Sequence, residues 1–364
     1  MCYDVRVRKK EADRPIQNNK KEKEKNKMKK AVAMVMVLVM MLALGVSAFA
    51  ESMTLTLDEA KQAALAYAGV KAADATFVKA HQDWDDGRKV YDIKFFANGV
   101  EYDLVDPTGN MTALVKDEVA DGDRISVATS IMSVDKDCEQ VGYIGKSDKA
   151  DIRLYMAAGE FCGNATMSAA AFFCDGISLP IGESRRVLVE SSGVDDNVSV
   201  DITRESDDGT YHCYSGRVHM PPPAKISLET FEYEGIGYEL PLVSFDGIDH
   251  VIMPYPELSD AQIETAVKQW WNITKAPCFG VMAIDNITGT SQISADIRPI
   301  VYAPAVDTCY WETSCASGTT AVAAWLRRST GREKITLYAK EPGGMLSVNA
   351  RDDNTLILGG HVKI

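Results

Sequence analysis

The sequence predicts an α+β protein in which two similar halves follow a small N-terminal α+β unit. Short strand-like runs separated by turns dominate residues 100–364, and two Gly- and Ala-rich helical segments interrupt them. These two segments match each other, which indicates a repeated architecture. With 364 residues, of which 46% are hydrophobic and 25% charged, the chain is long enough for two or three compact units.

Charge is distributed unevenly along the chain. Residues 1–30 hold 12 Lys or Arg and 5 Asp or Glu, a net +7, and because the whole chain has a formal net charge of −13, the remainder carries about −20. An acidic surface repels phosphate backbones. Nucleic acid is therefore not an expected partner.

The first fifty residues have the composition of a targeting sequence. Residues 1–27 are Lys-rich and are expected to form a disordered basic leader. Residues 28–50 combine two lysines, an apolar run and the small residues Ser47-Ala48-Phe49-Ala50, which is the pattern of a signal peptide cleaved before Glu51. An uncleaved membrane anchor is the alternative, because the run is also about as long as a bilayer span. A genuine signal predicts a secreted or membrane-anchored envelope protein; otherwise the chain is expected in the cytoplasm.

Residues 51–105 are expected to form a small α+β unit. An amphipathic helix is predicted from Leu57 to Gly69 with Asp58 as its N-cap, and strands follow around turns at residues 85–87 and 98–99. The helix and the segment KVYDIKFFANGVEYDLVDPTGN resemble the PepSY domain of secreted and envelope proteins. The resemblance implies contact with an envelope protein or a protease, and no catalytic residue. The final strand, VEYDLVDPTGN, also fits the start of the next unit.

The remainder of the chain is predicted to be rich in strands. The candidates are MTALVKDEV, RRVLVESSG, NVSVDIT, HVIMPY, GVMAID, RPIVYAP, KITLYAK and MLSVNA. Among them lie the two helical segments, CGNATMSAAAFF from Cys162 and CASGTTAVAAWL from Cys315. Both begin with cysteine, and Thr166 matches Thr319 at the fifth position. Each segment predicts a cysteine at the start of an apolar helix, one in each half-domain.

The eight cysteines lie at positions 2, 138, 162, 174, 213, 278, 309 and 315. None forms the two-residue-spaced pair of a zinc ribbon or a thioredoxin motif, so no structural metal site is expected. A disulfide framework is the ordinary interpretation of such a set in a secreted protein, but the spacing here is irregular.

A helix start suits both a thiolate and a bound carboxylate. It presents unpaired N–H groups and about half a positive charge. Gly163, Asn164, Ala316 and Ser317 are small or polar enough for an amino-acid carboxylate to reach those amides. One thiolate could then remove the α-proton while the opposite thiol delivers another, which inverts the centre without pyridoxal phosphate or a metal.

Two simpler interpretations of the cysteines remain open. A cysteine before an Ala-rich helix is most often a small buried hydrophobe. In that case the chain is a non-catalytic secreted envelope protein that binds or inhibits through its PepSY-like unit. A zinc site made of both cysteines and a histidine is the other interpretation, and no histidine lies at ligand spacing to either.

The segments DPTGNMTALV, CEQVGYI, GEFCGNATMSAAAF, YWETSCASGTTAVAAW and KEPGGMLSV, in this order, resemble the diaminopimelate epimerase superfamily. They are most similar to its histidine racemase branch, which supplies D-histidine to metallophore synthesis. The resemblance implies two pseudo-symmetric half-domains, residues 100–235 and 236–364, each a sheet wrapped around a central helix. The active site is then expected between them.

The resemblance also implies roles for individual residues. Cys162 and Cys315 match the catalytic acid/base pair. The positions that hold the substrate match Gly163, Asn164, Ala316 and Ser317 at the helix starts, together with Asn110 and Gln140 on the first strands. No cofactor and no metal are implied.

Three departures from diaminopimelate epimerase bear on the substrate. Asp307 and Thr308 replace the Glu-Arg pair whose arginine binds the distal carboxylate, and residues 247–250 read Gly-Ile-Asp-His in place of Gly-Asn-Pro-His. A substrate with two carboxylates would lose a bidentate partner. Ala316 stands where the family usually has glycine. Free histidine is therefore the expected substrate, with diaminopimelate as the alternative.

Overall fold

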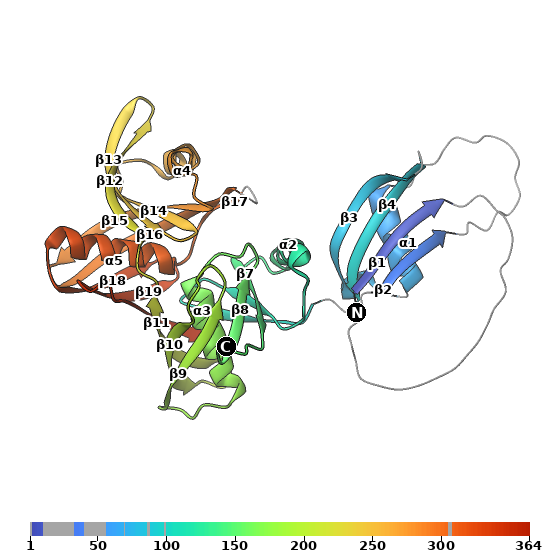
Figure 1. The fold of residues 1–364 in the computed structure, drawn as a ribbon, viewed down its shortest axis with the longest axis horizontal. Coiled ribbons are helices and arrows are strands. Elements are labelled where there is room, and N and C mark those ends of the chain that lie inside the picture. The colour runs from blue at the N-terminus through green and yellow to red at the C-terminus, as the bar shows by residue number, and fades with distance from the viewer. Residues whose placement is uncertain are drawn as a thin grey trace, which may run out of the picture. The chain divides into compact units, whose positions relative to one another are not determined.

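The computed structural model describes residues 2–9, 33–39, 56–68, 70–85, 88–97, 100–304 and 308–364. Contacts within the chain divide it into two compact units. The first unit comprises Met1–Glu101 and Ala120–Ser133, and the second comprises Tyr102–Val119 and Val134–Ile364. Figure 1 shows the elements of each unit.

The first unit is a four-stranded sheet with one long helix. The sheet has the order β2-β1-β4-β3, and α1 packs Ala60, Ala64 and Leu65 against Ile93 and Phe95 of the sheet. Its elements are β1 (Cys2–Lys9), β2 (Ala33–Val39), α1 (Leu57–Ala68), β3 (Ala75–Asp85) and β4 (Arg88–Ala97), and α2 (Arg124–Val134) follows later in the chain. The turn residues 86–87 and 98–99 and the predicted helix stop Gly69 lie outside the described residues.

The helix α1 is confirmed, but Asp58 is not its N-cap. Thr56 takes that role: its hydroxyl accepts the N–H of Glu59 at 3.3 Å, and the Glu59 carboxylate accepts the Thr56 N–H at 2.7 Å. This reciprocal pair is a capping box, which needs Ser or Thr three residues before Glu. The Thr56 backbone N–H, and then its hydroxyl, lower the pKa of Glu59.

Two strands of this sheet fall in the segments expected to be leader and signal. Cys2–Lys9 forms β1, where a disordered leader was expected, and it pairs antiparallel with β4; Ala33–Val39 forms β2. The sequence CYDVRVRK alternates apolar and charged residues with a period of two, which favours a strand. Residues 10–32 and 40–55 lie outside the described residues, so signal cleavage stays a prediction. Within the described ranges, no helix is both long and apolar enough to cross a bilayer.

The second unit contains a closed ring of strands around the helix α3 (Gly163–Gly176). The strand β20 closes the ring because it pairs with β11 on one side and with β5 on the other. The ring members are β5 (Tyr102–Pro107), β6 (Thr112–Val115), β7 (Gln140–Gly145), β8 (Ile152–Met156), β9 (Ser184–Ser191), β10 (Val198–Asp207), β11 (His212–Met220) and β20 (Leu356–Lys363). The segment VEYDLVDPTGN fitted both the PepSY-like unit and the unit that follows it. Its strand, β5, belongs to this second sheet.

The sheet continues past β20 through strands that pack on α5 (Ala316–Thr330). These strands are β19 (Gly344–Arg351), β18 (Lys334–Glu341), β16 (Gln292–Ala303), β15 (Cys278–Gly289), β14 (Ile248–Pro254), β13 (Ile236–Phe245) and β12 (Lys225–Tyr233), with β17 (Thr308–Trp311) beside β16. A further helix, α4 (Asp260–Thr274), packs on β12, β15 and β16. All eight strand candidates from the sequence overlap observed strands.

The strand pairing does not follow the half-domain boundary expected at residue 235. Strand β12 pairs with β13 as a hairpin, so it belongs with the second group of strands. The last strand of the chain, β20, belongs to the ring around α3. A single boundary in the sequence places both β12 and β20 in the wrong half, because hydrogen bonds between strands that are distant in the sequence decide which sheet each strand joins.

Candidate active site

The two sequence-matched cysteines occupy the same backbone position, at the start of each central helix. Cys162 is the N-cap of α3 with φ −128° and ψ 116°, and Cys315 is the N-cap of α5 with φ −127° and ψ 103°. Thr166 and Thr319 each donate a hydroxyl hydrogen bond to the carbonyl of their cysteine, at 2.7 and 2.8 Å. The predicted placement of a cysteine at each helix start is confirmed.

The first turns of the two helices meet. A Cβ placed on Gly163 would lie 2.9 Å from the Ala316 methyl, so only glycine fits opposite that alanine. Asn164, which is 2% exposed, donates its side-chain amide to the Ser314 carbonyl at 3.2 Å. The residues that follow Cys162 are thus packed against the residues on either side of Cys315.

A chain of amides surrounds the Cys162 thiol. Its Sγ donates to Gln140 Oε1 at 2.9 Å and accepts the Ala165 N–H at 3.4 Å. Gln140 Nε2 donates to Asn110 Oδ1 at 2.5 Å and to Thr112 Oγ1 at 2.7 Å. The structure therefore brings Asn110 and Gln140, two of the predicted substrate-binding residues, to the first cysteine.

Glu139, which was not among the residues predicted from the sequence, links the surroundings of the two cysteines. Its carboxylate accepts a hydrogen bond from the Asn110 amide at 2.6 Å and another from the Thr313 hydroxyl at 2.6 Å. Thr313 lies two residues before Cys315. The position of Glu139 directly before Gln140 was the available signal. Adjacent residues of a strand point to opposite faces, so Glu139 and Gln140 would not be expected at the same site if both lay in a strand. However, β7 begins only at Gln140, and Glu139 lies just before it.

A different set of groups surrounds Cys315, which is 5% exposed. Its backbone N–H donates to Glu341 Oε2 at 2.7 Å, and its Sγ lies 3.6 Å from the Ser317 hydroxyl. His250 Nε2 lies 2.9 Å from the same hydroxyl. Ser317 was a predicted site residue. Glu341 and His250 were assigned no role, although Glu341 lies in a segment that carried the family resemblance and His250 ends the motif at residues 247–250.

Comparison with known proteins agrees with this geometry. Residues 99–364 match the family model described as histidine racemase CntK N-terminal domain. The chain belongs to this family. It is an amino-acid racemase or epimerase.

Two curated relatives cover most of their own length in this match. The racemase is 28% identical over 267 residues to a histidine racemase of Fusobacterium nucleatum, which covers 71% of this chain and 93% of the relative. It is 25% identical over 261 residues to a histidine racemase of Staphylococcus aureus, at 69% and 89% coverage. The crystal structure of a probable proline racemase from Agrobacterium radiobacter shares the fold, with a TM-score of 0.51, 14% identity, and coverage of 72% of this chain and 89% of that one.

Both thiols of the racemase are held in the neutral form. Burial, followed by the nearby carboxyls of Glu312 and Glu160, raises the pKa of Cys162 to about 12 despite the Ala165 N–H, which lowers it. Burial and Glu312 also raise the pKa of Cys315 well above the ordinary value. From the sequence alone, the helix starts were expected to favour the thiolate. Here desolvation and the carboxyl charges outweigh that effect.

Carboxyls dominate the electrostatics of the site. Burial raises the pKa of Glu312 to about 7 and that of Glu341 to about 8. Burial also raises the pKa of Glu160, and one of its oxygens is buried without a partner. A cation or a hydrogen-bond donor would relieve this excess of acidic groups.

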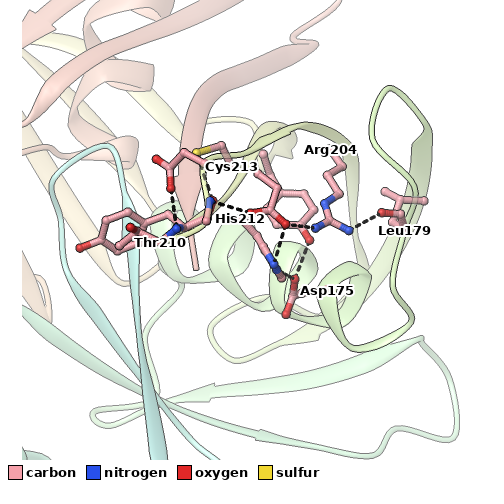
Figure 2. Close-up of polar contacts among 11 residues, drawn as sticks. Asp175, Leu179, Arg204, Thr210, His212 and Cys213 are labelled. Atoms are coloured by element: carbon pink, nitrogen blue, oxygen red, sulfur yellow. Dashed lines mark hydrogen bonds and ion pairs between the residues drawn. The ribbon is translucent and has the colours of Figure 1, made fainter.

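The opposite end of α3 carries a separate polar cluster, shown in Figure 2. Asp175 Oδ1 accepts the Tyr214 hydroxyl at 2.8 Å and lies 2.5 Å from His212 Nδ1. Arg204 donates to the Leu179 carbonyl at 3.1 Å. Asp175 lies thirteen positions after Cys162 along the helix, about 20 Å along its axis. The cluster anchors the end of α3 to β11 and takes no part in the thiol site.

The seven cysteines from Cys138 to Cys315 are free thiols. Asp307 lies outside the described residues, and Thr308 begins β17. In the described ranges, no group of three His, Cys, Asp or Glu residues is arranged to hold a metal ion.

Proposed function

We propose that this enzyme racemises free histidine by a two-thiol mechanism, with Cys162 and Cys315 as the acid/base pair. The observation that carries the proposal is the meeting of two helix starts, each capped by a cysteine. An amino acid bound there would have one thiol on each side of its α-carbon.

The backbone of the two first turns would bind the substrate carboxylate. Helix starts present free N–H groups, and Gly163, Asn164, Ala316 and Ser317 supply them here. This contact would also stabilise the negative charge that develops when the α-proton leaves.

The reaction itself needs only proton transfers. One sulfur, as thiolate, removes the α-proton and becomes a thiol. The opposite thiol delivers its proton to the other face of the carbanion and becomes the thiolate. The configuration is inverted, and the two cysteines have exchanged their thiol and thiolate forms. The reverse reaction begins from that state.

The thiolate would form only after substrate binds. In the free enzyme, burial and the neighbouring carboxyls raise the pKa of both thiols. The substrate's α-ammonium group would place a positive charge near Glu160 and Glu312 and so lower the pKa of the thiols. Glu312, with its pKa raised by burial to about 7, can accept the released proton near neutral pH.

Histidine is the proposed substrate because the curated relatives are histidine racemases and because the site is rich in carboxyls. An imidazole N–H or imidazolium is a suitable partner for Glu160, whose carboxyl oxygen is buried without one. A second substrate carboxylate, as in diaminopimelate, would face Glu160 and Glu312 and be repelled.

The test is hydrogen exchange into each enantiomer of histidine in deuterium oxide. Cys162→Ala and Cys315→Ala are each expected to lose racemisation by at least about 100-fold, the scale of acid/base catalysis. Each variant keeps one thiol, so each should still exchange the α-proton of one enantiomer, and the two variants should retain opposite enantiomers.

Cys174→Ala is the matched control, because Cys174 lies in the same helix α3 and is also buried. It should racemise normally. Exchange of both enantiomers by either single-thiol variant would contradict the assignment, as would racemisation of diaminopimelate in preference to histidine.

We further propose an envelope setting for the racemase. The basis is the signal-like segment 28–50 and the PepSY-like sequence of residues 51–105. The D-histidine product would supply metallophore synthesis, and the PepSY-like unit would contact an envelope protein or protease. Mass spectrometry of the mature N-terminus tests the signal: a chain that starts at Glu51 is expected, and an intact leader would reject it.

A further inference from the structure

Glu341 completes the start of helix α5 from a different strand. It is the last residue of β18 and is 4% exposed. One carboxyl oxygen accepts the Cys315 N–H at 2.7 Å, and the other accepts the hydroxyl of Thr319. Both oxygens are therefore used within the first turn of α5.

This arrangement replaces a capping box. In a capping box, a Glu or Gln at the third helical position accepts the N–H of the N-cap residue. In α5 that position is Gly318, and a Cβ there would lie 2.1 Å from Met282 Sδ and 3.2 Å from Cys315 Sγ. No side chain fits at Gly318, so Glu341 supplies the acceptor instead.

The consequence differs between the two cysteines. In α3 the Cys162 thiol itself caps the helix, because it accepts the Ala165 N–H. In α5 the Cys315 side chain makes no capping hydrogen bond. The carboxyl of Glu341 thus fixes the backbone of Cys315 and leaves the thiol free of the helix.

We propose that Glu341 is a positioning residue of the racemase, which holds the Cys315 backbone and whose charge controls how readily the Cys315 thiol ionises. The proposal rests on the acid/base role of Cys315 given above. A charged Glu341 opposes a thiolate at Cys315, and a neutral one does not.

The neighbouring groups set the sign of the expected effect. Glu341 faces Cys315 and Thr319 of α5, and it interacts with the carboxyl of Glu312. Cys315 faces Glu312, Glu341 and Ser317. His250, behind Ser317, has its pKa lowered by burial to about 3 and is therefore neutral. The charges near the thiol are all negative, so removing one should lower the pKa of Cys315.

The test compares Glu341→Gln with Glu341→Ala. The Gln variant keeps an acceptor for the Cys315 N–H and removes the charge, whereas the Ala variant removes both. In a Cys162→Ala background, the pH midpoint for alkylation of Cys315 should fall by about one unit in the Gln variant. With both cysteines present, the pH profile of kcat/KM should move in the same direction, while Glu341→Ala should lose kcat by at least about tenfold.

Glu333→Gln is the control, since Glu333 is exposed and lies just before β18. It should change neither the midpoint nor the rate. An unchanged alkylation midpoint in Glu341→Gln overturns the proposal, even if Glu341→Ala fails to fold. If the parent enzyme racemises no amino acid, the proposed function has failed; if it is active and the Glu341 variants behave like it, only this inference has failed.

Discussion

At the scale of single residues, the two catalytic candidates differ although their sequences match. Cys162 donates to Gln140 and accepts from Ala165, so its thiol is held on both sides. The Cys315 sulfur lies 3.6 Å from the Ser317 hydroxyl and interacts with the Glu312 carboxyl, and the Cys315 backbone N–H donates to Glu341. Two helices that start alike therefore present chemically different thiols. Racemisation from the two enantiomers is expected to differ in its pH dependence.

The buried carboxyls predict how stability depends on pH. Burial raises the pKa of Glu312 to about 7 and of Glu341 to about 8, so in the folded state both keep their protons to higher pH than in the unfolded chain. Their contribution to stability is complete below about pH 4.5, the ordinary value, and is lost as pH rises through 7 to 8. Each carboxyl contributes about 1.4 kcal/mol per pH unit at most.

The measurement is the free energy of unfolding in urea at pH 5 and pH 8. The parent chain should lose more stability over this interval than a variant with both Glu312→Gln and Glu341→Gln. Equal losses would show that neither carboxyl is protonated in the folded state. Glu333→Gln should follow the parent chain.

At the scale of elements, the close approach of α3 to its ring depends on small residues. The buried residues of α3 include Ala165, Ala169 and Ala170, which let the strands surround the helix closely. Gly216 on β11 serves the same purpose, because a Cβ there would lie 2.4 Å from Met167 Cγ. Dense packing in this region holds Cys162 at the helix start in one place.

Gly216→Ala is therefore expected to destabilise the racemase. The new methyl would overlap Met167 and push α3 from its ring, at a cost of about 1–3 kcal/mol. Thermal unfolding followed by circular dichroism measures the loss. Gly237→Ala on β13 is the control, because its Cβ would meet only Thr230 at an ordinary 3.4 Å. A melting temperature unchanged by Gly216→Ala would refute the packing argument.

At the scale of the whole molecule, the last strand joins elements that are far apart in the sequence. β20 pairs with β19, with β11 and with β5. It thus closes the ring around α3 and connects it to the strands around α5. The relative position of Cys162 and Cys315 depends on this strand.

Removal of residues 356–364 should therefore abolish folding of the second unit. The truncation opens the ring and exposes the buried side chains of Leu356, Leu358 and Val362. The expected result is loss of the cooperative unfolding transition and of histidine racemisation. Lys363→Ala, an exposed change in the same strand, should leave both intact. A truncated chain that still unfolds cooperatively and racemises histidine would contradict this role.

The sequence by itself determined where the two cysteine helices start and where most of the other elements lie. Matching cysteine segments identified both helices and their starts, because helix capping and apolar periodicity are local properties. The same local logic located the strands. It failed at the cap of α1, where the Thr56–Glu59 pair was overlooked.

Only the tertiary structure decided which distant groups act on those cysteines. Glu139, Glu341 and His250 reach the site through strand pairing and ring closure, and no spacing in the sequence connects them to a thiol. The protonation state of the thiols was decided in the same way. Burial is a property of the folded molecule. The free-energy cost of burying a charged sulfur exceeds the stabilisation that a helix start, which the sequence does indicate, gives to a thiolate.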